Sequence, residues 1–322
     1  MEKSKFVWAL LDNRAGNRNQ ILGILSQLKL KYKIIEIEYN FLAFLPNFLF
    51  QIFNNTIHVK SLKKYIKQPY PDIIISCGRR TATVALELKK KFNFRPFCIH
   101  LMNPRFTFFK KRFGLIFTPS HDKVKQNESI KKFLGSPSNI KLLTNINHEY
   151  ENPVIFLIIG GDHGNYKLSI KEVEKLIDKI IQKLNKKGTL LITTSRRSSK
   201  AVIEKINNIA KKYPVIKKIY HPNIFKNLNP YIRYLSIANE IIVTGDSMSM
   251  ISDACETSKP VRIYYNNNFC SKKHIKFCET LIKENYAFSF DTLGEKCKML
   301  KALNTSKKIA MEIKKNFKNE KY

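Results

Sequence analysis

Three loops in the second half of the chain combine the residue types that bind phosphate groups. The loop "IIGGDHGNY" contains Gly160 and Gly161, "TTSRRSS" contains Ser195 and Arg196, and "TGDSMSM" contains Ser247. Small residues let a phosphate approach the backbone, and an arginine side chain binds phosphate oxygens through paired hydrogen bonds. If the three loops open onto one edge of a sheet, they indicate a site for an anionic, nucleotide-like ligand. Each loop alone has a plainer explanation, because glycine permits tight turns and serine caps helices.

The stretch "TGDSMSMISDACETSKPV" follows the apolar run from Ile241 to Val243 and predicts a strand end, a tight loop and a helix. A helix in this place points its unpaired N–H groups, and the positive end of its dipole, beyond the end of the strand. That arrangement favours an anion such as phosphate. An ordinary capped helix also fits the stretch, with Ser247 or Ser249 at the N-cap and Asp246 as another candidate for that position.

The loop "TPSHD" contains the most suggestive acid–base pair, His121 followed by Asp122. Adjacent side chains on one loop can both reach a ligand, and histidine accepts a proton near neutral pH. The alternative is that Asp122 caps a helix beginning near Lys123 and that His121 is a surface residue. His163 and Asp12 are lesser candidates for a base.

Two loops in the first half also follow predicted strands. The loop "DNRAGNRNQ" contains Gly16 and Asn17, and "SCGRRTA" contains Gly78 and Arg79 at the start of a predicted helix. Loops in these places carry the function of many α/β proteins. The alternative is a pair of tight turns with a solvated arginine.

The elements that must position these loops alternate between short β-rich runs and amphipathic helical stretches, which predicts an α/β fold with parallel sheets. In the first half we expect strands near residues 5–12, 32–38, 72–78, 96–102, 115–119 and 140–146, and helices at 17–29 and 80–92. In the second half we expect strands at 153–161, 188–195, 215–220, 240–244 and 260–265, and helices at 169–187, 199–213 and 229–239 and after residue 244. The last forty residues are expected to be mostly helical.

A polar stretch with a proline, residues 145–153, separates two halves of similar pattern. We therefore predict a domain at residues 1–148 and a second at 149–322, with the last helix as a candidate to cross back to the first domain. Two facing doubly wound halves would place a ligand in the cleft between them, at the carboxyl ends of the strands.

The charge of the chain is extreme, with 58 Lys and Arg against 25 Asp and Glu and a net charge of +33. Such a surface attracts polyanions, including nucleic acid and acidic lipid head groups. The lysines are scattered through every segment, however, so a general compositional bias explains them equally well. Nucleic-acid binding is disfavoured because no helix-turn-helix, zinc-finger or RNP motif is present.

Other sequence features exclude several classes of site. The six cysteines form no CxxC pair, which argues against a zinc site and a disulfide framework and fits a reducing cytosol. No carboxylate pair suggests a metal site. The motifs GxxxxGK[ST], GxGxxG, GxSxG and HExxH are absent, which disfavours P-loop NTPases, dehydrogenases, α/β-hydrolases and zinc proteases.

Membrane attachment stays open at this point. No signal peptide is visible, and the most apolar stretch, residues 41–53, is too short to span a bilayer and contains Pro46. That stretch could pack on a domain or lie on a membrane. We expect a cytoplasmic protein, with peripheral attachment to the inner face of the membrane as the alternative.

Taken in order, the loops resemble those of the mitochondrial-fission Elm (elongated mitochondria) family. The resemblance rests on "VWALLDNRAGNRNQILGI", "PDIIISCGRRTA", "HLMNPR", "TPSHD", "LIIGGDHGNY", "LITTSRRS" and "NPYIRYLSIANEIIVTGDSMSMISDACETSKPV", and it runs from about residue 5 to 265. Plant members of the family are implicated in mitochondrial division, and bacterial relatives have often been labelled nucleotide-sugar enzymes. The family looks like a GT-B glycosyltransferase, with two facing Rossmann-like halves for acceptor and donor.

The resemblance also implies roles for individual residues. In donor halves of this type, the late strand–loop–helix binds the diphosphate, which implies this role for Ser247, Met248 and Ser249. An acidic residue further along that helix binds the ribose, and Asp253 occupies this position, where glutamate is more common. The remaining implied site residues are Gly160, Gly161, Ser195 and Arg196 at the diphosphate, and Gly16, Asn17, Gly78 and Arg79 on the acceptor side.

The activity implied by the resemblance is metal-independent glycosyl transfer from a nucleotide-diphosphate sugar to a cell-envelope acceptor. Basic side chains and the helix dipole would stabilise the departing diphosphate, and His121 or Asp12 would act as the base. No cofactor is expected beyond the nucleotide-sugar substrate. The alternative is a non-catalytic adaptor of the Elm type, bound to an anionic membrane surface; a lipid-linked acceptor is a further candidate partner.

Overall fold

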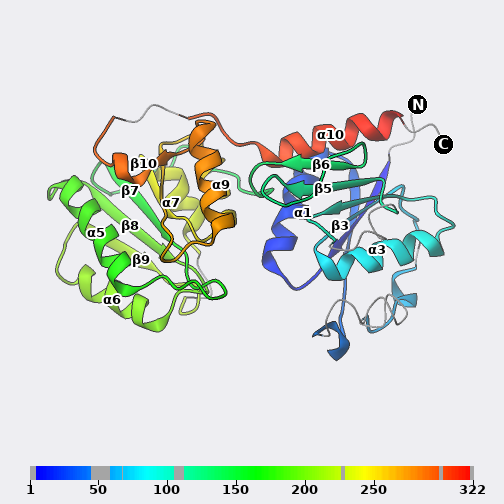
Figure 1. Cartoon of the computed structure of the whole chain (residues 1–322), viewed down its shortest axis with the longest axis horizontal. Coiled ribbons are helices and arrows are strands. Elements are labelled where there is room, and N and C mark those ends of the chain that lie inside the picture. Colours follow the sequence, from blue (N-terminus) through cyan, green and yellow to red (C-terminus); the bar gives the residue numbers. More distant parts are fainter. Residues whose placement is uncertain are drawn as a thin grey trace. The chain divides into compact units, whose positions relative to one another are not determined.

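Two parallel β-sheets with interleaved helices form the framework of the chain (Figure 1). The computed structural model describes residues 5–44, 59–66, 68–104, 112–225, 229–296 and 300–319. The contacts divide the chain into two units, which we call unit 1 (Met1–Asn139 with Asn304–Tyr322) and unit 2 (Ile140–Leu303). The α/β fold with parallel sheets that the sequence predicts is confirmed.

The sheet of unit 1 has the strand order β2-β1-β3-β4-β5-β6, and each pair of neighbours is parallel. Its elements are β1 (Phe6–Leu11), α1 (Ala15–Leu28), β2 (Lys31–Glu36), the 3-10 helices η1 (Phe41–Phe44) and η2 (Lys63–Tyr65), β3 (Ile73–Cys77), α3 (Arg79–Lys91), β4 (Phe97–Leu101), β5 (Leu115–Pro119), β6 (Ile130–Phe133) and α10 (Thr305–Asn319). Every residue of β3, β4 and β5 is buried, as expected for strands covered on both faces.

Helices cover the two faces of this sheet. On one face, Ala85 and Leu88 of α3 pack against Trp8 of β1. On the other face, the cluster contains Ile24 of α1 and Ile313 of α10. The strands therefore lie in the middle layer of unit 1, and loops follow them at the carboxyl edge of the sheet.

Helix α10 comes from the end of the chain but belongs to unit 1. Two hydroxyl groups at its start fasten it: Thr305 Oγ1 donates to the carbonyl of Leu134 at 2.7 Å, and Ser306 Oγ donates to the carbonyl of Ser138 at 2.9 Å. Gly23 of α1 allows this approach, because a Cβ there would lie 2.4 Å from the carbonyl oxygen of Ser138. Residues near both ends of the sequence thus complete one core.

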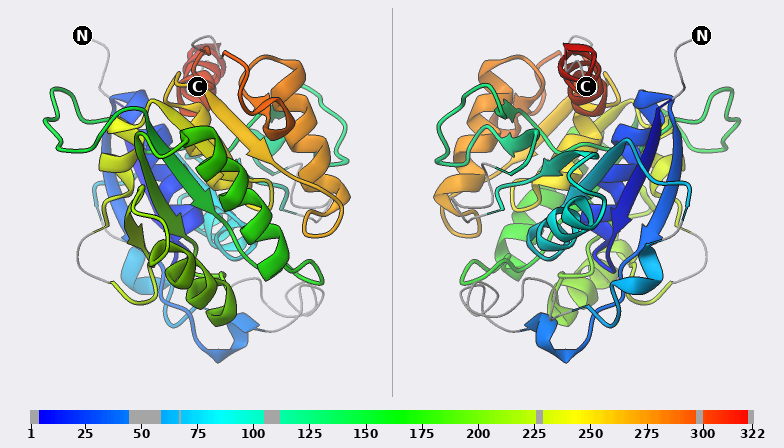
Figure 2. Two further views of the ribbon diagram at one scale, coloured as in Figure 1. Left: turned by 90° about the vertical axis from the view of Figure 1, so that its left-hand side faces the viewer. Right: turned by 90° about the vertical axis from the view of Figure 1, so that its right-hand side faces the viewer.

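The sheet of unit 2 has the order β12-β11-β10-β7-β8-β9 and is also parallel. Its elements are β7 (Val154–Ile159), α5 (Ile170–Leu184), β8 (Thr189–Thr194), α6 (Lys200–Ala210), β9 (Ile216–Tyr220), α7 (Tyr231–Ile237), β10 (Glu240–Thr244), α8 (Met248–Cys255), β11 (Val261–Tyr264), α9 (Lys272–Lys283), β12 (Phe288–Ser289) and η3 (Phe290–Thr292). The left-hand view of Figure 2 shows α5 and α6 in front of the strands.

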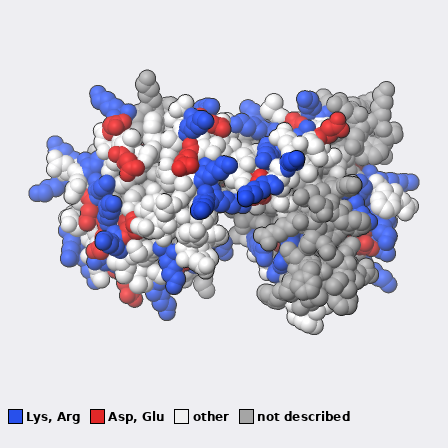
Figure 3. Space-filling model, in the orientation of Figure 1, with Lys and Arg blue, Asp and Glu red and all other residues white. Residues whose placement is uncertain are grey.

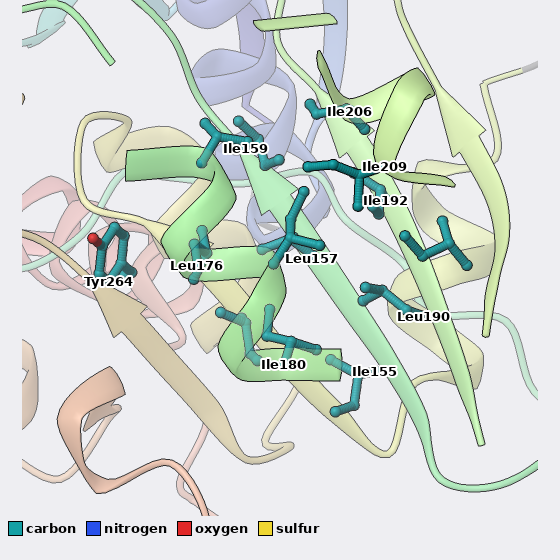
Figure 4. Packing of buried hydrophobic residues seen from close by; sticks show 14 of the residues in the cluster. Ile155, Leu157, Ile159, Leu176, Ile180, Leu190, Ile192, Ile206, Ile209 and Tyr264 are labelled. Carbon is teal, nitrogen blue, oxygen red and sulfur yellow. The ribbon is translucent and has the colours of Figure 1, made fainter. Parts of the chain in front are cut away.

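The core of unit 2 follows from the periodicity of these elements. Alternate residues of β7, Leu157 among them, point to the same face, and residues such as Leu176 and Ile206 come from the apolar sides of α5 and α6 (Figure 4). Serine caps start both helices, since Ser169 Oγ accepts from the N–H of Glu172 and Ser199 Oγ accepts from that of Val202.

A buried arginine fixes the edge of this sheet at β11 and β12. Arg262 is fully buried, and its Nε donates to Glu240 Oε1 at 2.6 Å. Its Nη1 and Nη2 donate to the carbonyls of Thr292 at 2.6 Å and Glu295 at 2.8 Å. The guanidinium therefore ties η3 and the following residues to β10 and β11.

Two predicted elements are wrong. Residues 140–146 form no strand: this segment is mostly exposed, with Leu143 51% exposed, and the sixth strand of unit 1 is β6 instead. This short edge strand is hard to recognise in the sequence because Lys131 and Lys132 interrupt its apolar pattern. Residues 283–322 are also less helical than predicted, because β12 and irregular backbone precede α10 in the described part of this segment.

The charged surface and the apolar stretch 41–53 both bear on membrane attachment. Figure 3 shows Lys and Arg side chains on both units, with Asp and Glu among them. Among the helices that the structure describes, none is long and apolar enough to cross a bilayer. Of the apolar stretch 41–53, residues 45–53 lie outside the described residues.

Candidate functional site

Three loops meet at the carboxyl edge of the unit 2 sheet. They follow β7, β8 and β10, and these strands are neighbours in the order β10-β7-β8. Because all three strands are parallel, their carboxyl ends lie at the same edge. We call these loops the β7, β8 and β10 loops; Gly160 and Gly161, Ser195 to Ser198, and Gly245 to Ser247 belong to them in that order.

A buried carboxylate joins the three loops. Asp246 is 2% exposed, and it accepts hydrogen bonds from Thr244 Oγ1 at 2.6 Å and from the N–H of Gly161 at 2.7 Å. Arg197 Nη2 lies 3.4 Å from Asp246 Oδ2. Burial raises the pKa of Asp246, and the hydrogen bonds from Thr244 and Gly161 oppose that shift. The suggestion that Asp246 caps α8 is therefore wrong, because its carboxylate bonds to the β7 loop.

The two glycines of the β7 loop allow this close contact between the loops, because neither carries a Cβ. A Cβ at Gly160 would lie 2.0 Å from Asp246 Oδ2, and one at Gly161 would lie 2.3 Å from the backbone of Arg197. The N–H of Gly160 donates to Thr244 Oγ1 at 2.7 Å, and that of Gly161 donates to Asp246. Both N–H groups are thus used within the protein, which leaves neither to a phosphate in this conformation.

Arg197 follows Arg196 in the sequence TTSRRSS, where only Arg196 is predicted as a phosphate ligand, and it crosses from the β8 loop to the other two loops. Its Nη1 donates to the carbonyl of Asp162 at 3.0 Å, and its Nη2 contacts Asp246. The predicted residue, Arg196, is exposed; its carbonyl accepts from Asn223, and its side chain makes no hydrogen bond or ion pair among the described residues. Adjacent arginines therefore differ: Arg197 is held in place, and Arg196 is available to a ligand.

Serine side chains set the shape of the β8 loop. Ser195 Oγ accepts from the N–H of Arg197 at 3.0 Å, and the N–H of Ser195 donates to Ser198 Oγ at 3.0 Å. Ser198 Oγ in turn donates to the carbonyl of Gly160. Ser195 is buried, so its role in this structure is to stabilise the turn that directs Arg197 toward Asp246.

The start of α8 is the open part of this edge. Ser247 occupies the N-cap position, as one alternative predicted, but its side chain makes no capping bond. No hydrogen bond involves the N–H groups of Met248 and Ser249 in the described chain, and Ser249 is exposed. A helix start of this kind presents backbone donors and the positive end of the helix dipole.

Asp253 lies further along α8 and is partly buried. The hydroxyl of Tyr231 donates to its Oδ2 at 3.5 Å, and the ring of Tyr231 packs edge-on against Phe156. Burial, followed by the charge of Asp253, raises the pKa of Tyr231 well above its ordinary value. A ribose at Asp253 would share the carboxylate with this tyrosine.

In unit 1, the structure brings together the predicted residues of two adjacent strands, β1 and β3. Asp12 is buried and accepts from Asn17 Nδ2 at 3.2 Å and from the N–H of Arg14 at 3.1 Å. Gly78 has φ +83° and stands at the N-cap of α3, where a Cβ would lie 2.7 Å from Asn17 Nδ2. Gly16 has open space around it, and Arg79 begins α3.

His121 and Asp122 follow β5, two positions along the sheet from β3. His121 Nε2 lies 3.9 Å from Asp122 Oδ1, and both side chains are largely buried. The alternative that Asp122 caps a helix is wrong, because a turn and irregular backbone follow it. In unit 2, His163 lies in the β7 loop and its ring packs edge-on against His274.

Each unit also holds a buried histidine bonded to a hydroxyl group. In unit 1, Ser76 Oγ lies 2.8 Å from His100 Nδ1, and burial lowers the pKa of His100 to about 3. In unit 2, Thr194 Oγ1 lies 2.9 Å from His221 Nδ1, and burial again lowers the pKa of the imidazole. His221 Nε2 contacts Asn207 Oδ1 at 3.2 Å, so this neutral ring holds the end of β8 against α6.

A family sequence model described as mitochondrial fission ELM1 matches residues 15–317. The chain belongs to this family. The protein RP120 of Rickettsia prowazekii is 32% identical, and the match covers 96% of this chain and 97% of that protein. Mitochondrial fission protein ELM1 of Arabidopsis thaliana is 25% identical, over 72% of this chain and 61% of the plant protein. The expected membership of the Elm family is confirmed.

Solved structures show that this ELM1-family chain has the GT-B fold. A structure of MnaA from S. aureus with UDP has a TM-score of 0.58 at 14% identity and matches over 99% of both chains. The glycosyltransferase SnogD from Streptomyces nogalater has a TM-score of 0.55 at 10% identity, over 98% of this chain and 96% of that chain. Identities this low establish the fold alone, and the predicted GT-B-like architecture is confirmed.

Proposed function

We propose that unit 2 binds the diphosphate of a nucleotide sugar at the carboxyl edge of its sheet. The observation that carries this proposal is the uncapped start of α8, directly after Asp246, which contacts Arg197 of the β8 loop. Backbone donors at a helix start bind phosphate well, and Arg196, an exposed residue of the β8 loop, would add a charged hydrogen bond. The likeness to MnaA, whose structure contains UDP, supports the same kind of ligand.

The bound diphosphate would be held by groups with distinct tasks. Met248 and Ser249 would supply N–H groups, and Arg196 would supply an exposed cation. Arg197 and Asp246 keep the three loops together, so they position the donors without being the main ligands. Asp253, partly exposed on α8, is the proposed ribose ligand.

The proposed reaction is metal-independent glycosyl transfer to an acceptor hydroxyl of the cell envelope. The developing charge on the leaving diphosphate would be stabilised by the start of α8 and by Arg196. Asp12 and His121 in unit 1 are the proposed bases, since a carboxylate or an imidazole can take the proton of a hydroxyl group. Gly16, Asn17, Gly78 and Arg79 remain the proposed acceptor-side residues.

Calorimetric titration with UDP and with UDP-, GDP-, CMP- and ADP-linked sugars tests the binding step. We expect one nucleotide series to bind, and Arg196→Ala to weaken it by roughly tenfold. Lys200→Ala is the matched control, because it removes one exposed positive charge at the start of α6, outside the three loops. Failure of every nucleotide to bind below millimolar concentration would refute the proposal.

A second function, a non-catalytic adaptor on an anionic membrane, is favoured by the family and by the net charge of +33. It predicts co-sedimentation with vesicles that contain acidic lipids, loss of that binding at high salt, and no effect of nucleotides. Binding that survives high salt or responds to UDP would count against it.

A further inference from the structure

Unit 1 contains a cavity at the edge of its sheet opposite to Asp12 and Gly78. The cavity measures about 690 Å³, and residues that lead into three strands line it: Lys5 before β1, Asp72 before β3 and Pro96 before β4. This is the amino edge of the parallel strands. The cavity is therefore separate from the loops assigned above to the acceptor, and it lies in a different unit from the proposed diphosphate site.

Aromatic rings form one wall of the cavity. Tyr70 and Phe92 lie with their ring centroids 5.0 Å apart, and both line the space. Phe92 is held rigidly, because it is buried and packs edge-on against Trp8 at 5.4 Å. Tyr70 is 53% exposed, so much of its ring is uncovered. A flat apolar ring could stack on this wall.

Positive side chains dominate the charge around the cavity. Lys5, Lys91 and Arg95 line it with one carboxylate, Asp72, which also accepts from the N–H of Phe6 at 2.8 Å. Lys91 and Arg95 make no ion pair with any residue that the structure describes. The lining thus carries three positive charges against one negative charge, and none of the three cations forms an ion pair within the described part of the chain.

The end of α3 does not reverse this sign. Carbonyl groups at a helix end carry partial negative charge, but three of the last four in α3 accept hydrogen bonds: the N–H of Phe92 donates to Leu88, that of Asn93 to Lys90 and that of Phe94 to Lys89. The side chains therefore set the potential in the cavity.

The backbone beside the cavity is strained. Asn93 has φ +51° and Phe94 has φ +61°, and the left-handed region is costly for a phenylalanine. Phe94 is 65% exposed, so core packing does not explain why this residue stands there. The turn brings Arg95 back to the cavity, and its N–H donates to the carbonyl of Phe92 at 3.2 Å.

We propose that this cavity binds a small phosphate ester of a flat aromatic ring. The volume suits a whole small molecule, since ligand sites commonly measure about 300–1,000 Å³. The ring would stack on the exposed ring of Tyr70, beside Phe92, and the phosphate would pair with Lys91 and Arg95. A phosphate monoester carries about two negative charges at neutral pH, which matches the excess positive charge of the lining.

Titration of the full-length chain with 1-naphthyl phosphate tests this proposal, with 1-naphthol and inorganic phosphate as the two halves of the probe. We expect the intact ester to bind more tightly than either half by at least tenfold. Lys91→Glu and Arg95→Glu should each weaken it by roughly tenfold, because each removes a cation and adds an anion. Tyr70→Ala should weaken the ester and leave inorganic phosphate unchanged.

Lys90→Glu is the matched control, since it makes the same charge change one residue away on the exposed surface of α3 and does not line the cavity. Equal weakening by Lys90→Glu and Lys91→Glu would overturn the proposal, because overall charge would then explain the binding. Equal affinity for 1-naphthol would also overturn it. Addition of UDP should not displace the probe, and displacement would assign the binding to unit 2 instead.

Thermal unfolding of each variant in the absence of probe separates lost binding from lost folding. Lys91, Arg95 and Tyr70 are exposed, so we expect their variants to unfold within a few degrees of the original chain.

Discussion

The carboxyl edges of the two sheets hold their loops in different ways. In unit 2, Asp246 bonds to the β7 loop through Gly161 and to the β8 loop through Arg197, so one carboxylate joins loops that are far apart in the sequence. In unit 1, Asp12 bonds to Arg14 and Asn17, in the loop and helix that directly follow its own strand.

This difference indicates how each edge responds to change. The unit 2 loops share one buried charge, so a disturbance in any of them reaches the others. The unit 1 loops are stabilised locally, and Gly16 has open space around it. We therefore expect substitutions at the unit 2 edge to lower the free energy of unfolding more than substitutions at the unit 1 edge.

The largest effect is expected for Gly160→Ala, because its Cβ would lie 2.0 Å from the carboxylate of Asp246. The free energy of unfolding of unit 2 should fall by about 3 kcal/mol. Gly16→Ala, inside α1, should instead leave stability unchanged or raise it by up to about 1 kcal/mol. Denaturant unfolding followed by circular dichroism measures both.

Fluorescence of Trp8, the single tryptophan and a core residue of unit 1, shows which unit is affected. Gly160→Ala should move the circular-dichroism transition more than the Trp8 transition. A larger shift of Trp8 fluorescence would mean that the damage is not confined to the unit 2 edge.

Lower pH should weaken unit 1 through His100, whose pKa falls from an ordinary 6.5 to about 3 on burial. Between these values the unfolded chain binds a proton that the folded chain excludes, so stability is lost as the pH falls below 6.5. The loss should reach about 2 kcal/mol at pH 5. His100→Phe should remove this component, as judged by Trp8 fluorescence at several pH values.

The burial of His221 predicts that unit 2 also loses stability as the pH falls, since the pKa of His221 is lowered as well.

The His100 prediction has a clear counter-outcome. If the stability difference between the original chain and His100→Phe stays constant from pH 7 to pH 5, then the His100 ring is not buried and neutral as described.

Arg197→Ala should cost about 1.5 kcal/mol, because it leaves Asp246 buried without its cation while the arginine itself is 38% exposed. Arg196→Ala should change stability by less than about 0.5 kcal/mol. Calorimetric unfolding measures the loss of stability in each of the two variants. Similar losses for both would remove the distinction between a positioning arginine and a ligand-binding one.

The smallest effects concern helix caps within unit 2. Ser199→Ala should cost about 1 kcal/mol, since Ser199 Oγ accepts from the N–H of Val202, whereas Ser247→Ala should cost almost nothing. The rise in unfolding temperature on addition of UDP can also be compared between the Ser199→Ala and Ser247→Ala variants. A cost at Ser247 equal to that at Ser199 would show that α8 is an ordinarily capped helix.

Most of the fold could be predicted because buried parallel strands and amphipathic helices have distinct periods. The run Val154–Ile159 is apolar throughout, and Ile73–Cys77 is buried throughout with Ser76 as its one polar residue. Edge strand β6 has no clear sequence signal because its two central residues, Lys131 and Lys132, are charged and lie partly buried and exposed, respectively. Apolar residues in 140–146 predict a strand, but they lie in an irregular segment, where Leu143 is exposed and the other apolar residues are partly buried.

The loops of the candidate site could also be predicted, but not the contacts within them. Sequence favoured Arg196, while Ser195 Oγ holds the turn so that Arg197 crosses to Asp246. Which of two adjacent arginines turns inward depends on that backbone geometry. Likewise Asp246 resembles a helix cap in sequence, and its partner Gly161 lies 85 residues away.

The return of α10 to unit 1 has a consequence for synthesis of the chain. The apolar side of α1 is completed by Ile309 and Ile313, which leave the ribosome after all of unit 2. Until then, the newly made first segment carries an uncovered apolar surface, which favours aggregation.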